Sequence, residues 1–248
     1  MQHLKLTVSY FGEKFVGWQV QPNGLSIQEC LERAWKKITQ EQIRITASGR
    51  TDSGVHAYAQ ICHLKTETQI EFEVLRRAIN AHTPEEIEVL LIEKTTPDFH
   101  AIRSAIEKTY RYQINWGHPR DVFQIGRSWY IPQRLNVPGM IEAAKLFEGE
   151  HDFISFAAAN GQAATSIRTI KKIECRSLRP TTVPKPPHRG HCRRLSLQYG
   201  QNDRGNAGPC RISQPSAHLG SRGHRGERPS FGRNDRTRLW AVSAECCV

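Results

Sequence analysis

Residues 43–64 read IRITASGRTDSGVHAYAQICHL, and this stretch predicts a strand, a tight exposed loop and a second strand. The loop, GRTDSG at 49–54, begins and ends with glycine, which adopts turn conformations that other residues resist. Such a turn can hold the Asp52 carboxylate at the end of a rigid sheet, with Arg50 nearby to keep it ionised. The same residues also fit a plain connection between strands, in which Asp52 forms an Asx turn.

The sequence on both sides of this stretch mixes strand and helix patterns. Apolar residues alternate with polar ones in LKLTVSY at 4–10 and in TYRYQINW at 109–116, which predicts half-buried strands. Ser26, followed by Glu29, marks the start of a helix that ends near Thr39. This mixture favours an α+β fold with antiparallel strand pairs. The other expected elements are helices at 72–81 and after Asn136, and strands at 43–48, 55–64, 87–94 and 165–175.

The positive charge of the chain is concentrated near its C-terminal end. Of 248 residues with a net charge of +11, residues 1–175 hold 21 Lys and Arg against 20 Asp and Glu, whereas residues 176–248 hold 14 against 4. The latter segment also contains 13 Arg, 8 Gly and 7 Pro. Such a composition cannot bury enough apolar surface to offset the entropy of ordering, so it predicts a disordered basic tail. Arginine-rich tails of this kind bind RNA.

Composition also narrows the class of protein. No apolar run approaches the roughly 18 residues of a membrane span, and the N-terminal residues contain no apolar stretch typical of a signal peptide. The seven cysteines form no C-x-x-C pair, which favours a reducing, cytoplasmic environment over a disulfide framework. His188, His191 and Cys192 lack a fourth ligand at a typical zinc spacing, so no metal site is expected.

Several motifs, taken together, resemble the TruA-type tRNA pseudouridine synthases. GRTDSGVHA at 49–57 is similar to the signature loop of that family, and the resemblance covers about residues 1–176. The other matching segments are VSYFGEKFVGWQVQPNGLSIQECLE (8–32), DFHAIRSAIEKTYRYQI (98–114), FEGEHDFISF (147–156) and SIRTIKKIEC (166–175). One departure is local, because Arg103 stands one position later than the arginine of the family's ARxSA pattern.

The resemblance implies roles for four residues. Asp52 matches the catalytic aspartate, Arg50 the arginine associated with flipping of the target nucleotide, and Tyr110 the tyrosine that packs on the target base. Without the resemblance, Tyr110 is better explained as a core-facing strand aromatic, since Tyr112 and Trp116 share its face. Arg168 matches an arginine that either contacts RNA or serves only the fold. A carboxylate at position 52 can act as a nucleophile or stabilise a cationic sugar, and attack on the base or on the sugar both remain open.

The resemblance also implies the reaction and the architecture. The family isomerises uridine to pseudouridine at positions 38–40 in the anticodon stem-loop of tRNA, without cofactor or metal, as a cytoplasmic homodimer. Its pseudouridine synthase fold has two similar α+β halves that share a central antiparallel sheet flanked by helices. On this basis we expect residues 1–105 to form the N-terminal half with the catalytic loop, residues 106–178 to begin the second half, and residues 179–248 to form a basic Arg/Gly/Pro-rich tail that is out of frame, irregular and disordered.

The tail lacks the third motif of the family, GxGFLxxMVRxIVGTL, and the closing segment TAPAxGLxL. Read one nucleotide later, codons for RRLSLQYGQNDRGN (193–206) can encode DGFLYNMVRTIVG, and codons for RNDRTRLWAVSAECCV (233–248) can encode ATTAPASGLCLLSVV. Two matches in the expected order predict a frameshift between about Arg176 and Arg193. The arginine that pairs with the catalytic aspartate is then missing, so we expect little or no activity of the chain as written. The alternative function is a non-catalytic RNA-binding remnant with a cationic tail.

Overall fold

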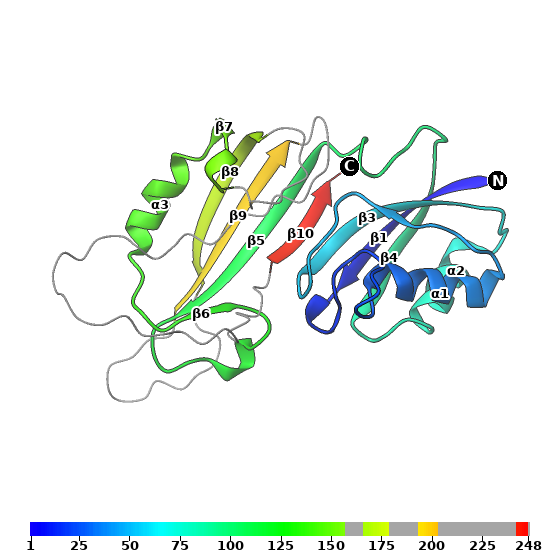
Figure 1. Cartoon of the computed structure of the whole chain (residues 1–248), viewed down its shortest axis with the longest axis horizontal. Coiled ribbons are helices and arrows are strands. Elements are labelled where there is room, and N and C mark those ends of the chain that lie inside the picture. Colours follow the sequence, from blue (N-terminus) through cyan, green and yellow to red (C-terminus); the bar gives the residue numbers. More distant parts are fainter. Residues whose placement is uncertain (157–165, 179–192, 203–241, 248) are drawn as a thin grey trace.

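The computed structural model describes residues 1–156, 166–178, 193–202 and 242–247 as a mixed α/β structure (Figure 1). Strands dominate it, and three α-helices and three short 3-10 helices lie between them in the described part. The strands are β1 (Gln2–Tyr10), β2 (Thr46–Ala47), β3 (His56–Thr66), β4 (Ile87–Thr95), β5 (Glu107–Trp116), β6 (Trp129–Ile131), β7 (Gly149–Asp152), β8 (Ile167–Leu178), β9 (Arg193–Asn202) and β10 (Val242–Cys247). The helices are η1 (Gly12–Lys14), α1 (Ile27–Thr39), α2 (Phe72–Asn80), η2 (Val122–Gln124), α3 (Val137–Lys145) and η3 (Ile154–Phe156).

The front of the chain folds around the alternating apolar residues of β1. Leu4, Leu6 and Val8 are fully buried, and they pack with one face of α1 in the largest hydrophobic cluster. The helix begins where the sequence predicts, because the Ser26 hydroxyl accepts a hydrogen bond from the backbone N–H of Glu29 at 3.2 Å. Burial of these apolar side chains is the main force that holds α1 on the sheet.

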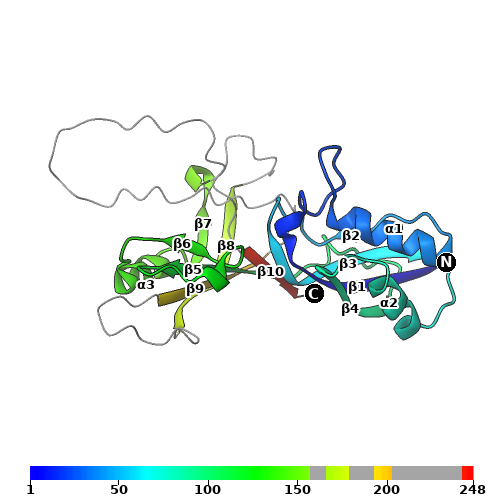
Figure 2. The same cartoon turned by 90° about the horizontal axis from the view of Figure 1, so that it is seen from below.

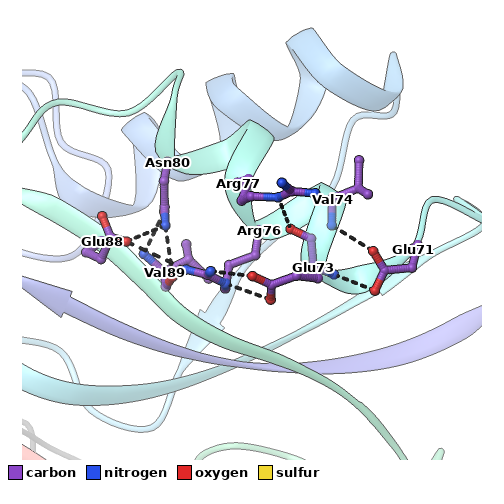
Figure 3. Close-up of polar contacts among 8 residues, drawn as sticks. All are labelled: Glu71, Glu73, Val74, Arg76, Arg77, Asn80, Glu88 and Val89. Atoms are coloured by element: carbon purple, nitrogen blue, oxygen red, sulfur yellow. Dashed lines mark hydrogen bonds and ion pairs between the residues drawn. The ribbon is translucent and has the colours of Figure 1, made fainter.

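Helix α2 is joined to β4 by polar contacts as well as by packing (Figure 3). The Glu71 carboxylate caps the helix by accepting from the N–H groups of Glu73 and Val74. At the other end, the Asn80 side chain donates to the Val89 carbonyl at 3.0 Å and accepts from the Val89 N–H at 2.8 Å. Asn80 therefore continues the hydrogen bonding of β4 like a short added strand.

The second half has a smaller core. Ile114 and Trp116, at the end of β5, are buried, and the partly buried side chains of β6 and of α3 pack against them. Figure 1 shows α3 beside β8, on the opposite side of the molecule from α1 and α2.

One sheet connects both halves, in the order β4-β1-β3-β10-β5-β9-β8-β7, with β2 beside β3 and β6 beside β5. Most neighbours are antiparallel, which confirms the expected fold class; β10 with β3 and β6 with β5 are parallel. Strand β10 lies between β3 and β5, so it is the element through which the two parts of the sheet are hydrogen-bonded (Figure 2).

The expectation of an irregular tail over residues 179–248 is wrong for two segments. Residues 193–202 form β9, paired with β5 and β8, and residues 242–247 form β10. RRLSLQYG alternates Leu195, Leu197 and Tyr199 with polar residues or glycine, a strand pattern that the average composition of the tail conceals. The rest of the predicted tail lies outside the described residues.

Candidate active site

The Asp52 loop begins and ends on paired strands. Thr46 of β2 lies opposite His63 of β3, and the Ser48 N–H donates to the Ile61 carbonyl at 2.8 Å, which extends this pairing toward the loop. Asp52 lies in the loop between the two strands, and its side chain is exposed. The Asp52 carboxylate is thus carried on a short loop with a rigid base, and the residue is exposed to solvent.

A second segment supports the loop from the side. The Phe15 carbonyl accepts from the Gly54 N–H at 3.3 Å and from the Ser53 hydroxyl at 3.2 Å, and the Trp18 N–H donates to the Thr51 carbonyl at 3.0 Å. These bonds hold the residues on both sides of the carboxylate. The loop is thus bonded to a distant segment of the chain as well as to its own strands.

Two residues, Gly17 and Tyr10, determine how closely this supporting segment approaches the Asp52 loop. Gly17 forms a β-bridge with Asp52 and has a φ of 114°, and a Cβ added to it would lie 2.5 Å from the Thr51 carbonyl oxygen. Only glycine permits this contact. The Tyr10 hydroxyl bonds the Thr51 hydroxyl at 2.9 Å. Burial raises the pKa of Tyr10, so the phenol stays neutral and the bond persists at all moderate pH values.

The start of the loop is contacted by two polar residues that sequence reasoning did not assign. The Gln60 amide donates to the Ser48 hydroxyl at 3.0 Å and to the Gly49 carbonyl at 3.1 Å. The Lys108 side chain of β5 is buried, and its Nζ would lie 3.7 Å from a Cβ at Gly49. In the sequence, both residues could have been recognised as polar side chains at positions of an alternating strand that face inward.

The comparison with known families decides what this loop belongs to. A family model described as tRNA pseudouridine synthase matches residues 6–102 and 143–189, which include the whole Asp52 loop and β8. The chain belongs to the tRNA pseudouridine synthase family. The first matched segment contains the Asp52 loop and the residues from Phe15 to Trp18 that support it.

Individual synthases are similar over most of their length. The tRNA pseudouridine synthase A of Beijerinckia indica is 42% identical over 179 residues, which are 72% of this chain and 69% of that protein. The tRNA pseudouridine synthase A of a Geobacillus strain is 38% identical over 70% of each chain. The tRNA pseudouridine synthase A 2 of Clostridium perfringens is 39% identical over 70% of this chain and 71% of that protein. These enzymes belong to an isomerase family.

Of the other residues expected at the synthase site, Tyr110 shares a sheet face with a residue that reaches the loop. Tyr110 and Lys108 are two positions apart on β5, which pairs with β10 and β9 without a register shift, so their side chains project from the same face. Lys108 reaches Gly49 on that face. Tyr110 is half-buried and pairs with Ala244 and Tyr199 across the sheet.

Arg50 and Arg168 lie in different places. Arg50 is exposed in the same loop as Asp52. Arg168 lies on β8, opposite His151 of β7, and β9, β5 and β10 separate β8 from β3 in the sheet. Its guanidinium donates to the Ile167 carbonyl at 2.7 Å. The sheet therefore does not bring Arg168 next to the loop through strand pairing.

Within the ranges that the structure describes, no three His, Cys, Asp or Glu side chains gather as metal ligands. His188, His191 and Cys192 lie outside those ranges. No helix of the described part is long and apolar enough to cross a membrane.

Proposed function

We propose that this family member is organised to convert uridine to pseudouridine at positions 38–40 of the tRNA anticodon stem-loop, with Asp52 as the catalytic carboxylate. The observation that carries the proposal is the exposed Asp52 on a loop bonded from both sides, at Phe15 and at Gln60. A carboxylate held in this way can attack the base or the sugar without the entropy cost of ordering a mobile loop.

We further propose that the target nucleotide leaves its stack to reach this loop. Arg50 would occupy the space of the departing nucleotide, and Tyr110 would offer its ring to the uracil face. Their places support this, since Arg50 is exposed beside Asp52 and Tyr110 shares the face of Lys108. Arg168 would contact tRNA farther along the sheet, beyond β9. No cofactor or metal enters the proposed reaction.

We propose that the chain as written has little or no synthase activity because a frameshift has removed the third motif. The matched family segments end at residue 189, within the interval between Arg176 and Arg193 where the shift is expected, which supports the proposal. The missing motif carries the arginine that, by the family resemblance, pairs with the catalytic aspartate, and loss of one member of such a pair is strongly unfavourable. Tritium release from tRNA labelled at uridine C5 should stay at background for this chain, and normal turnover would contradict the proposal.

A chain with the restored reading frame tests separately whether the frameshift causes the inactivity and whether Asp52 is the catalytic carboxylate. A chain re-read one nucleotide later from about Arg176 should release tritium, and Asp52→Asn in that chain should lower kcat by at least about 1,000-fold. Asp98→Asn, which alters an exposed carboxylate outside the loop, should leave kcat within about twofold. Equal losses for the two variants would exclude Asp52 as the catalytic carboxylate.

The second candidate function is RNA binding without catalysis. It is favoured by the charge of residues 176–248, which contain 14 Lys and Arg but only 4 Asp and Glu. In this case the chain would bind tRNA with an affinity that falls steeply with salt, and Asp52→Asn would not change that affinity. We also propose that the frame-restored chain is cytoplasmic and forms a homodimer, as the family does. The dimer is tested by the molar mass of the purified protein in light scattering.

A further inference from the structure

His56 joins three segments of the chain near the Asp52 loop. Its imidazole is nine-tenths buried, with 8% of its surface exposed. Nδ1 accepts a hydrogen bond from the Gly12 N–H at 2.8 Å, and Nε2 lies 2.9 Å from the Gly126 carbonyl oxygen. Because Nδ1 accepts, it carries no proton, so the hydrogen of the neutral ring is on Nε2 and is donated to Gly126. Both nitrogens of a neutral imidazole are thereby satisfied.

The bonded segments come from different parts of the sequence. Gly12 belongs to η1, and a Cβ added to it would lie 1.9 Å from the carbonyl oxygen of Val55, next to the loop. Gly126 belongs to the segment 117–128, which follows β5 in the second half. His56 thus lies between the front half, close to the catalytic loop, and a connection of the second half.

Ring stacking and charge reinforce the same contact. The His56 ring stacks on Phe11 with centroids 4.2 Å apart and planes 12° from parallel. The Arg127 guanidinium lies 5.7 Å from the centroid of the Phe11 ring. A Cβ added to Gly126 would lie 2.5 Å from a Glu13 carboxylate oxygen, so η1 and the 117–128 segment are in direct contact.

We propose that neutral His56 is a positioning residue that holds the segment 117–128 of the second half against η1 and so fixes the second half relative to the Asp52 loop. Its importance for catalysis rests on the proposed function, but the contact itself can be measured without any activity. On protonation, Nδ1 becomes a donor and can no longer accept from Gly12, so the contact with η1 is lost.

The charges around the imidazole set the direction of this dependence. Glu13 of η1 favours the imidazolium, and Arg127 of the 117–128 segment disfavours it. Burial outweighs both and lowers the pKa of His56. The neutral form therefore persists through neutral pH, and the contact opens only at acidic pH.

The proposal is tested first on the unaltered chain. In NMR spectra of the imidazole nitrogens at pH 7.5, His56 should be neutral, with its proton on Nε2. A ring protonated on Nδ1 at this pH would overturn the proposal, and this measurement needs no variant that might fail to fold.

Variants of His56 then test whether its side chain holds the segment 117–128 in place. Hydrogen exchange of the amides in 117–128 and of Gly12, corrected for intrinsic rates, should rise about tenfold in His56→Ala while the β1 amides stay protected. His56→Gln retains an amide N–H that can reach Gly126 and should restore protection of 117–128. His56→Asn retains an acceptor near Gly12 and should restore only Gly12. His82→Ala, which removes an exposed histidine at the end of α2, is the matched control.

The outcomes separate positioning from general stability. Rescue of each segment by its own variant, and loss of protection of the wild-type Gly12 amide at acidic pH, support the proposal. Unchanged exchange of 117–128 in His56→Ala, or equal exchange in the Gln, Asn and Ala variants, would overturn it. Either result stands whether or not the chain forms pseudouridine, so failure of the proposed function is recognised separately.

Discussion

At the residue scale, Gly17 shows why the site could not be assembled from its own motif alone. The Asp52 loop is readable in the sequence, and Arg50 and Asp52 were predicted within it. The segment that supports the loop from the side lies more than thirty residues earlier, and its contact depends on a backbone φ of 114° at Gly17. No local sequence pattern predicts that two distant backbone segments pack this closely. Gln60 and Lys108 show in the sequence only as polar residues at inward strand positions, and their closeness to Gly49 is a tertiary feature.

Gly17→Ala should therefore destabilise the chain by about 1–3 kcal/mol, since alanine resists this φ and its Cβ would meet the Thr51 carbonyl. The free energy of unfolding in urea measures the loss. Gly49→Ala is the control, because its Cβ would lie at an ordinary 3.7 Å from Lys108 and no unusual φ is involved. Equal stabilities of the two variants would contradict the assigned role of Gly17.

His63 supplies a pH dependence at the same scale. Burial, and then the neighbouring His100 with its ring centroid 4.6 Å away, lower the pKa of His63 to about 4. In the unfolded chain the pKa returns to about 6.5, so the unfolded state binds the proton first as the pH falls. The free energy of unfolding should thus decrease between about pH 6.5 and pH 4. His63→Gln should flatten this part of the curve, whereas the exposed-site variant His82→Gln should not.

At the scale of elements, local patterns predicted most of the strands and helices. The alternation in β1 and β5 and the cap of α1 were correct to within a few residues. The strand expected at 43–48 is shortened to Thr46–Ala47, because in this stretch these two residues form the paired ladder with β3, and Ser48 adds one further bond to it. Strands β9 and β10 were missed because the composition around them indicates disorder, and β10 in addition pairs with strands from distant parts of the sequence.

The cap of α1 gives the prediction for this scale. Ser26→Ala removes the acceptor for the Glu29 N–H and should lower the free energy of unfolding by about 1 kcal/mol. Thermal or urea unfolding followed by circular dichroism measures it. Ser155→Ala changes an exposed serine outside the helices α1 to α3 and should leave the stability unchanged; a similar loss there would show that the cap bond contributes nothing specific.

At the scale of the whole molecule, the sheet depends on β10. It pairs with β3 on one side and with β5 on the other, so its six residues join the front strands to those of the second half. The family resemblance predicted a continuous sheet and two halves, but it could not predict that a strand from the basic tail completes the sheet.

Removal of residues 242–248 should uncouple the two halves. Urea unfolding followed by tryptophan fluorescence should then change from one transition to two, one reported by Trp35 in the front core and one by Trp116 in the second core. Removal of Val248 alone should leave a single transition. A single transition after the longer deletion would show that contacts such as those of His56 join the halves without β10.

The place of β10 also bears on how the chain folds as it leaves the ribosome. Strands β3 and β5 are synthesised long before the strand that lies between them. Until translation reaches residue 242, both have an open backbone edge that can pair with another nascent chain. Strand β10 can thus join the sheet only after β3 and β5 have been made, by inserting between their two open edges.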